Sequence, residues 1–402
     1  MSTAAEGEVV DLAALIHPLT IEEFFADYWE KKPLHQRRGD ATYYESVLTD
    51  RDLDAIISSS DLRYPAIQLA KGGGYYPPEA YTRSVKLASE VFEGVVDVEK
   101  VRSEYRAGAT VVLPALNRTW PALRSLCASL EAHFNHGVSA NGYLTAGDTA
   151  GFGPHYDTHE VLVLQIGGKK HWRICEPPIT LPHRSQPFPR SGYTPPAPVL
   201  EVDLEPGDLL YLPRGYVHSA STGPCHSAHV TIGITVYTWV ELVSELLVSC
   251  KNIPGFREAL PAGFAGRGYL RAALKEGLLQ RIDELRRHTD FDDVVDSFTQ
   301  RVRSTWPRPT PAFQASARVV GPTTVLRAPA PGRYVIATEK GNTSLEFDGK
   351  KLLLPAGVRA TLDAMCARAA FRVADLPRTL DDHAALAFAR YLEGEGFLRH
   401  VD

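Results

Sequence analysis

Short apolar runs of strand length dominate the chain between about residues 108 and 240. They read TVVLPAL, GYLTA, VLVLQIG, HWRIC, LEVDL, DLLYLP and HVTIGITVYT. Turn-forming segments, such as Gly167-Gly168 and the EPGD at 205–208, separate several of them and let neighbouring strands lie antiparallel. Several short strands divided by turns predict an all-β barrel or sandwich. A double-stranded barrel is the architecture that we favour.

One run in this region, HVTIGITVY, alternates cleanly between two kinds of side chain. Because successive residues of a strand point to opposite faces, its apolar residues are predicted to share one face. These are Val230, Ile232, Ile234 and Val236, and the opposite face carries His229, Thr231, Gly233 and Thr235. We expect the second face, with its small polar residues, to line a pocket.

Helical periodicity appears on both sides of the β-rich region. Residues 21–30 carry apolar positions at helical spacing after Thr20, which can cap the helix. Residues 239–303 contain three stretches with apolar stripes. Beyond the proline-rich WPRPTPAF at 306–313, about 90 residues read as a small α/β module, with Thr379 as the cap of its last helix. We therefore predict three parts, 1–240, 241–305 and 306–402.

Two segments are predicted to be loops. Residues 177–198 contain eight prolines, so they cannot form an interior strand or helix, and we place them at the mouth of the barrel. The glycine-rich KGGGYYPP at 71–78 lacks the sequence context of a phosphate-binding loop and is interpreted as a turn.

Composition narrows the classes of function. The chain has 402 residues, 44% of them apolar, and a formal net charge of -5, which is typical of a globular protein and disfavours direct binding to nucleic acid or anionic membranes. Its five cysteines are widely spaced without a CxxC pair, which suits a reducing compartment. No secretory leader or membrane-length apolar stretch is recognised, so we expect a cytoplasmic protein.

His155 and Asp157 lie two residues apart in the β-prone segment GPHYDTHEVLVLQIG. Both side chains then project from one strand face and can reach one ion. His218 follows another apolar strand, 61 residues beyond Asp157, and is the candidate third ligand. Two imidazoles and one carboxylate are the facial triad of non-haem Fe(II) enzymes, with zinc and a bound water as the alternative.

A second HxD pattern, His288-Thr289-Asp290, lies in a charged helical stretch, and we expect it not to bind metal. The first copy differs because Lys170 follows it, after the Gly-Gly turn. An ammonium inside a barrel requires an anionic partner, which a dicarboxylate co-substrate would supply. The alternative is a solvated turn lysine, and that is the interpretation we give to Lys169.

Further polar residues lie on strand faces in this region. Thr231 can donate its hydroxyl to a bound carboxylate, or serve only as a good strand former. Asn141 and Tyr143, two apart in NGYLTA, can orient a substrate or form core hydrogen bonds. His159 shares the face of the ligand pair, and we favour a supporting role for it over that of an alternative ligand.

Several motifs occur in a characteristic order along the chain. They are FFADYWEKKPL, NGYLTA, the metal segment, LEPGDLLYLPRGYVH, HSAHVTIGITVY and the final DLPRTLDDHAALAFARYLEGEGFL. In these motifs the chain resembles the JmjC-type, cupin-like 2-oxoglutarate oxygenases, specifically the ribosomal oxygenase branch of protein hydroxylases. The resemblance implies a mainly β fold with α segments: a double-stranded β-helix in 1–240, a helical dimerisation segment in 241–305 and a winged-helix-like domain in 306–402.

The resemblance also implies roles for individual residues. It matches His155, Asp157 and His218 to iron ligands, Lys170 and Thr231 to residues that hold the distal carboxylate of 2-oxoglutarate, and Asn141 and Tyr143 to residues that line the substrate pocket. The implied protein is a homodimeric dioxygenase that uses Fe(II), O2 and 2-oxoglutarate. It would hydroxylate a side chain of a protein or peptide, a ribosomal protein among the candidates, and release succinate.

Three positions depart from the pattern of histidine-hydroxylating relatives. Gly233 stands where they carry Ser, Val112 where a polar residue lines their pocket, and Thr158 where they carry an acidic residue. We therefore expect a wider and less polar substrate pocket, which suits another protein residue, a modified peptide or a small metabolite.

The remaining alternatives are a tailoring oxygenase for a small natural product and a non-catalytic cupin-like scaffold. Histone demethylation ranks low, since the sequence indicates no methyl-lysine aromatic cage.

Overall fold

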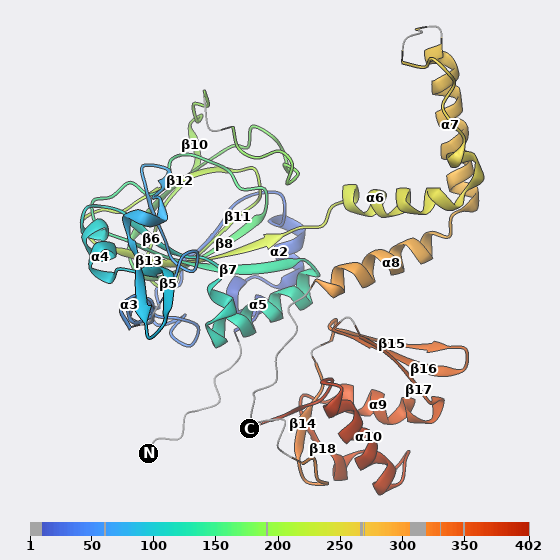
Figure 1. Ribbon diagram of the computed structural model, residues 1–402. Helices are drawn as coiled ribbons and strands as arrows, with labels where there is room; N and C mark the ends of the chain where they lie inside the picture. The colour runs from blue at the N-terminus through green and yellow to red at the C-terminus, as the bar shows by residue number, and fades with distance from the viewer. Residues whose placement is uncertain are drawn as a thin grey trace. The chain divides into compact units, whose positions relative to one another are not determined.

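The computed structural model describes residues 10–401, except for 60–61, 190–191, 266–267, 269, 306–318, 330 and 349. The chain divides into two compact units, Met1–Val236 and Tyr237–Asp402 (Figure 1). The proline-rich boundary expected at 306–313 lies outside the described residues. The division into three domains at residues 240 and 305 stays a prediction.

The first unit is a β core with helices on its outside (Figure 1). Its helices are α1 (Leu12–Ile16), α2 (Ile21–Asp27), α3 (Asp50–Ser59), α4 (Val98–Arg106) and α5 (Pro121–Phe134). Its strands are β1 (Leu34–Gln36), β2 (Gln68–Lys71), β3 (Gly74–Tyr75), β4 (Thr82–Leu87), β5 (Glu90–Val96), β6 (Thr110–Leu113), β7 (Gly137–Thr145), β8 (Glu160–Gly168), β9 (Lys170–Cys175), β10 (Pro198–Leu204), β11 (Leu209–Leu212), β12 (Val217–Ser221) and β13 (Ser227–Thr235).

Two antiparallel sheets form this core. The larger has eight strands in the order β1-β11-β8-β13-β7-β6-β2-β3, and the smaller has three in the order β10-β9-β12. Val161 and Val163 of β8 pack in one cluster with Trp172 and Ile174 of β9, so the two sheets lie face to face. This arrangement is the predicted barrel-like double sheet.

The alternation along β13 sorts its side chains as predicted. Val230, Ile232 and Ile234 are fully buried in the main apolar cluster, together with residues of the covering helices such as Phe24 of α2 and Leu126 of α5. The opposite face of the strand therefore points towards the smaller sheet. β13 pairs with β7 on one side and β8 on the other, so its main chain is fixed along its whole length.

Local signals at the helix and turn ends are mostly confirmed. Thr20 caps α2 in a capping box with Glu23, although the helix ends at Asp27, earlier than the predicted residue 30. The glycine-rich turn joins β2 to β3, and Gly72 and Gly73 adopt the positive φ angles that this turn requires.

The second unit contains a helical part and a small mixed module. The helices are α6 (Trp239–Ser249), α7 (Leu270–His288), α8 (Phe291–Ser304), α9 (Arg359–Cys366) and α10 (Asp382–Gly394), and the strands are β14 (Val325–Arg327), β15 (Tyr334–Glu339), β16 (Asn342–Phe347), β17 (Lys350–Leu354), β18 (Phe371–Arg372) and β19 (Arg399–His400). The predicted Thr379 cap is wrong: α10 begins after Asp381, whose carboxylate accepts from the Ala384 amide at 2.7 Å. Within the described residues, no helix is long and apolar enough to cross a membrane.

A buried ion network ties the N-terminal segment to the sheet. Arg214 donates to Glu160, at 2.7 Å, and to Glu30. Tyr211 donates to the second oxygen of Glu160 at 2.5 Å and accepts from the Glu30 amide at 2.9 Å. The side chains of Arg214 and Glu160 are 5% and 0% exposed, so each charge depends on the other for compensation.

We expect Arg214→Met to lower the free energy of unfolding by about 3–5 kcal/mol, because it leaves the Glu160 carboxylate buried without its cation. Combining it with Glu160→Gln should recover part of this loss. Urea denaturation of the three proteins measures the difference.

The matched control is Arg102→Met, which breaks an exposed ion pair with Glu99 and should cost less than about 1 kcal/mol. An Arg214→Met variant as stable as this control would show that the buried network contributes little.

Candidate functional site

His155, Asp157 and His218 come together at one end of the first unit. Each offers one ligand atom, and these atoms all lie within 4.8 Å of one another. Nε2 of His218 is 3.7 Å from Oδ2 of Asp157, and the two imidazole rings are 4.5 Å apart between centroids. Among the described residues, these three form the only group of His, Cys, Asp and Glu side chains with this geometry.

The main chain holds the two histidines together directly. The His155 amide donates to the His218 carbonyl at 3.1 Å, and the His218 amide donates back to the His155 carbonyl at 2.8 Å. This pair is a single antiparallel bridge beyond the regular pairing of the strands. The Gly215 amide in turn donates to the Asp157 carbonyl at 3.0 Å. Residues that are far apart in sequence are thereby placed in a fixed register.

Hydrogen bonds orient both imidazole rings. Nδ1 of His155 lies 2.8 Å from the Gly153 carbonyl, and Nδ1 of His218 lies 3.1 Å from the Tyr216 carbonyl. Since a carbonyl only accepts, the proton of each neutral ring resides on Nδ1. Nε2 of each ring is then free to bind a metal ion.

The charges at the site suit a cation. Burial works to raise the pKa of Asp157, but the imidazoles of His159, His218 and His155 outweigh burial and lower it. Burial lowers the pKa of His218 to about 4, with a further contribution from His155. The carboxylate is therefore ionised and His218 neutral at pH 7, which are the forms that ligate metals.

Lys170 is buried close to this site without a carboxylate partner among the described residues. Its side chain is at the start of β9, only 3% of the residue is exposed, and Nζ contacts the Thr145 hydroxyl at 3.0 Å. Burial lowers the pKa of this ammonium to about 7. Lys169, by contrast, is exposed and pairs with Asp203 and Glu205, as predicted.

The three ligands and the buried lysine line one cavity of about 70 Å³. Its walls are formed by Thr110, Tyr143, Gly151, Phe152, His155, Asp157, Val161, Lys170, Trp172, His218, Ser219, Ala220, His229 and Thr231. The residues come from both sheets and from the 146–154 loop, so the cavity lies between the sheets. Such a space accommodates a small ligand that touches both the ligand group and the ammonium.

The residues predicted to bind co-substrate and substrate take different positions. Thr231 lines the cavity. Tyr143 also lines it and stacks on His229, with 4.8 Å between ring centroids and an interplanar angle of 2°. Asn141 is not a wall of the cavity, and its side-chain oxygen accepts from the Ala115 amide at 2.9 Å, where it fixes a left-handed turn.

Sequence reasoning missed three residues of the cavity region. Thr145, which contacts Lys170 and Thr110, follows Tyr143 by two residues, so the alternation that selected Tyr143 would also have selected it. His229 lies on the predicted pocket face of β13, but no binding role was predicted for it. Trp172 follows Lys170 by two residues in β9, and the same alternation would have found it.

The His159 side chain lies against Gly233 of β13. A Cβ atom placed on Gly233 would lie 2.8 Å from Cδ2 and 2.9 Å from Nε2 of His159. The space beside Gly233 is therefore filled by an imidazole, and neither residue is a wall of the cavity; the wider and less polar substrate pocket stays a prediction. Val112 is buried in β6 opposite Tyr143.

The proline-rich segment 177–198 packs against the metal segment. Phe188 and Tyr193 cluster with Tyr156, whose hydroxyl donates to the Gln186 carbonyl at 2.9 Å. Tyr156 separates two of the ligands in sequence. The predicted loop thus contacts the metal segment through the Tyr156 side chain.

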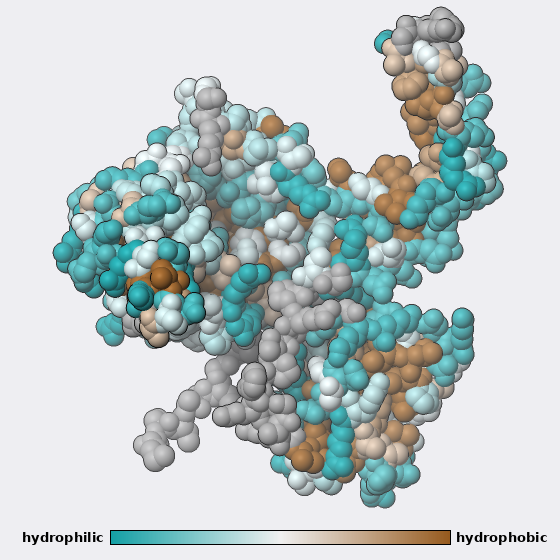
Figure 2. Space-filling model, in the orientation of Figure 1, coloured by the Kyte–Doolittle hydropathy of each residue, from teal (hydrophilic) through white to brown (hydrophobic). Residues whose placement is uncertain are grey.

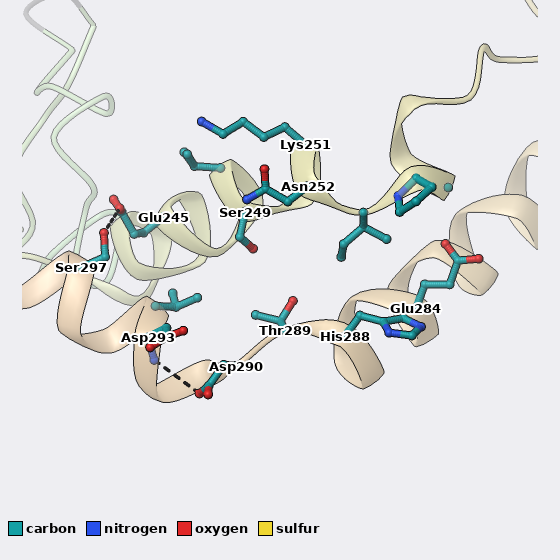
Figure 3. Close-up of a pocket in the computed structure, with 15 residues that line it drawn as sticks. Glu245, Ser249, Lys251, Asn252, Glu284, His288, Thr289, Asp290, Asp293 and Ser297 are labelled. Atoms are coloured by element: carbon teal, nitrogen blue, oxygen red, sulfur yellow. Dashed lines mark hydrogen bonds between the residues drawn. The ribbon is translucent and has the colours of Figure 1, made fainter. Parts of the chain in front are cut away.

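The second HxD pattern lies at a helix end, and its expected lack of a metal ion stays a prediction. Figure 3 shows His288, Thr289 and Asp290 at the junction of α7 and α8, beside a cavity of about 780 Å³. The Asp290 carboxylate caps α8 by accepting from the amides of Asp292 and Asp293 at 3.0 and 3.4 Å. The carboxylate is thus engaged by the helix end.

Residues 118–242 match the family model of the JmjC domain. Ribosomal oxygenase 1 of Gallus gallus is 30% identical over 72% of this chain and 49% of its own length, and ribosomal oxygenase 2 of Bos taurus is 35% identical over 54% and 46%. The bifunctional lysine-specific demethylase and histidyl-hydroxylase NO66 of Aedes aegypti is 34% identical over 58% and 36%. The chain spans about half, or less, of the length of these curated relatives.

Solved structures agree on the fold. The Escherichia coli ribosomal oxygenase YcfD in complex with cobalt and 2-oxoglutarate is similar over 96% of this chain and 99% of its own, with a TM-score of 0.53 and 17% identity. At this identity the likeness concerns the fold, and it agrees with the double sheet described above. Residues 118–242 therefore match the JmjC domain, and the chain is similar to ribosomal oxygenases in sequence and to YcfD in fold.

Proposed function

We propose that the protein is an Fe(II)- and 2-oxoglutarate-dependent dioxygenase that hydroxylates a side chain of a protein or peptide. One observation carries this proposal: a two-histidine, one-carboxylate group lines the same small cavity as a buried ammonium, which has no counter-ion among the residues that the structure describes. The ligand group suits Fe(II), and the ammonium suits a carboxylate.

The residues present fit the metal. His155, Asp157 and His218 would hold it on one side and leave the cavity side open. The imidazole rings are already oriented by their Nδ1 hydrogen bonds and the Asp157 carboxylate is ionised, so binding of a divalent cation would need little reorganisation. Iron held there would supply oxidising chemistry in which 2-oxoglutarate and O2 yield succinate and CO2, with one oxygen atom passing to succinate and the other into a substrate C–H bond.

The rest of the cavity would hold the co-substrate. Lys170 would bind its distal carboxylate, with Thr231 as a second contact from the facing strand. Phe152 and Trp172 would exclude water, which strengthens the ionic interaction inside. The YcfD complex with cobalt and 2-oxoglutarate supports this assignment for a protein of the same fold.

The relatives' names favour a macromolecular substrate. Ribosomal oxygenases 1 and 2 are among them, so a ribosomal protein is the first candidate. Tyr143, at the cavity wall, would position the substrate, and Asn141, two residues before it in β7, would act indirectly by holding the Ala115 amide. A tailoring oxygenase for a small natural product is the second candidate. It is favoured by the departures at Val112 and Thr158 from the pattern of histidine-hydroxylating relatives.

The test is succinate formation by the purified protein with Fe(II), 2-oxoglutarate and oxygen. We expect turnover in the wild type and none in Asp157→Ala, which removes a ligand. Asp290→Ala is the matched control, since it changes the second HxD pattern and should cost only about 1 kcal/mol of helix capping with turnover retained.

Candidate substrates are then added to the same reaction. Stimulation by a ribosomal-protein fraction, with a mass gain of one oxygen atom in one peptide, would identify a protein hydroxylase. Stimulation by small metabolites alone would favour the tailoring enzyme. A protein that binds iron yet forms no succinate with any fraction would contradict both and favour the scaffold.

The affinity for 2-oxoglutarate should depend on pH through Lys170. With a pKa of about 7 in the free protein, the ammonium is present below pH 7 and lost above it. The affinity should therefore be level below pH 7 and fall up to tenfold per pH unit above it. Calorimetric titration of the manganese-loaded protein between pH 6 and 9 measures this.

Lys170→Met is the control for this titration. It should bind 2-oxoglutarate weakly and without the pH dependence above 7. A wild-type affinity that is constant between pH 6 and 9 would exclude a titrating ammonium at the site.

We also propose that the protein forms a homodimer through residues 239–303. Apolar side chains on α6 and α7 are unusually exposed, among them Leu247 at 55%, Leu278 at 61% and Ile282 at 50%, and Figure 2 shows brown patches over these helices. Exposed apolar surface of this kind is typical of an interface.

The five free thiols support the predicted cytoplasmic location.

Leu278→Asp should convert the dimer to a monomer, because it places a charge in the apolar contact. Light scattering on a sizing column measures the mass. Leu353→Asp, at an exposed position of β17 in the C-terminal module, should leave the dimer intact. A monomeric wild type would contradict the proposal.

A further inference from the structure

Two buried nitrogen atoms near Lys170 have no hydrogen-bond partner among the described residues. They are Nδ1 of His229 and Nε1 of Trp172. Both residues are walls of the cavity that Lys170 and the three metal ligands share. Buried polar groups in folded proteins are nearly always paired, and an exception calls for a water or a ligand.

The polar groups around Lys170 are mainly hydrogen-bond donors. Lys170 and Trp172 contribute only donors, and Asp157 is the only acidic side chain among the described residues that line the cavity. Burial, with the nearby Lys170 ammonium, holds the pKa of His229 well below its usual value, so the ring is neutral and keeps one N–H donor. One cation and two neutral donors form a site for an anion.

The main chain directs His229 into this site. The pairing of β13 with β8 shifts register between Ala228 and His229, and bulges of this kind re-aim a side chain. On its other side, His229 pairs with Tyr143 of β7. The Tyr143 ring lies flat against the imidazole, and Trp172 meets it edge-on with 5.8 Å between centroids. The imidazole is therefore fixed before any ligand binds.

We propose that His229 and Trp172 bind the distal carboxylate of the dicarboxylate co-substrate together with Lys170, as neutral donors that fix its orientation. This inference rests on the proposed function, because the anion is the 2-oxoglutarate assigned there. It adds two residues to the contact and makes the site selective for an acid with a second carboxylate over one without.

The test compares 2-oxoglutarate with pyruvate as ligands of the manganese-loaded full-length protein. Pyruvate has the same 2-oxo acid group but lacks the distal carboxylate. His229→Phe keeps an aromatic ring to stack on Tyr143 and removes both ring nitrogens. We expect it to weaken 2-oxoglutarate binding by about tenfold or more, as for loss of a hydrogen bond to a charged group, with pyruvate and manganese affinities unchanged.

Two further variants keep the result independent of folding. His229→Gln retains an N–H donor and should recover part of the affinity, and Trp172→Phe removes only the indole N–H and should weaken 2-oxoglutarate selectively. Thermal unfolding of each variant checks that the sheet is intact. The quenching of Trp172 fluorescence by 2-oxoglutarate, absent in Trp172→Phe, gives a second readout.

The outcomes separate this inference from the proposed function. If the wild type binds 2-oxoglutarate no better than pyruvate, the proposed function fails. If the wild type prefers 2-oxoglutarate and folded His229→Phe and Trp172→Phe keep the full preference, only the inference is overturned. An equal loss for both ligands in the variants would also overturn it, since it would indicate a purely structural role.

Discussion

The site depends above all on the reciprocal pair of backbone hydrogen bonds between His155 and His218. These two bonds bring together residues that are 63 positions apart in sequence and set the register of the metal segment before β8 against β12. The side chains then need only the local carbonyl contacts of Gly153 and Tyr216 to be oriented. Backbone pairing of this kind therefore fixes the relative positions of the three ligand side chains.

The two faces of the central strand β13 have different functions: one packs in the apolar core and the other lines the cavity. One face buries Val230, Ile232 and Ile234 under the helices, and this apolar packing rigidifies the strand. The other face presents His229 and Thr231 to the cavity. The free energy gained on the helix side offsets the cost of keeping polar groups and the Lys170 ammonium away from water on the other.

Much of this could be predicted from the sequence, because alternation and spacing are local. The two faces of β13, the pairing of His155 with Asp157 and the contrast between Lys169 and Lys170 all follow from patterns within a few residues, whereas His218 had to be sought 61 residues beyond Asp157. The predicted start of the last helix is wrong because Thr379 and Asp381 are both good N-caps, and only the structure decides between them. The fit of His159 over Gly233, the bulge before His229 and the second role of Asn141 arise from contacts between distant segments, which no local pattern encodes.

The proline-rich segment 177–198 has closely spaced ends, since Cys175 pairs with both Pro198 and Val217 across the smaller sheet. The ends of the insertion are thus held by strands that exist whatever lies between them. The entropic cost of closing such a loop grows only with the logarithm of its length. Changes of length in this segment should therefore be tolerated by the metal-binding frame wherever they spare the contacts of Gln186, Phe188 and Tyr193 with Tyr156, so the loop can carry a new outer surface without altering the site beneath it.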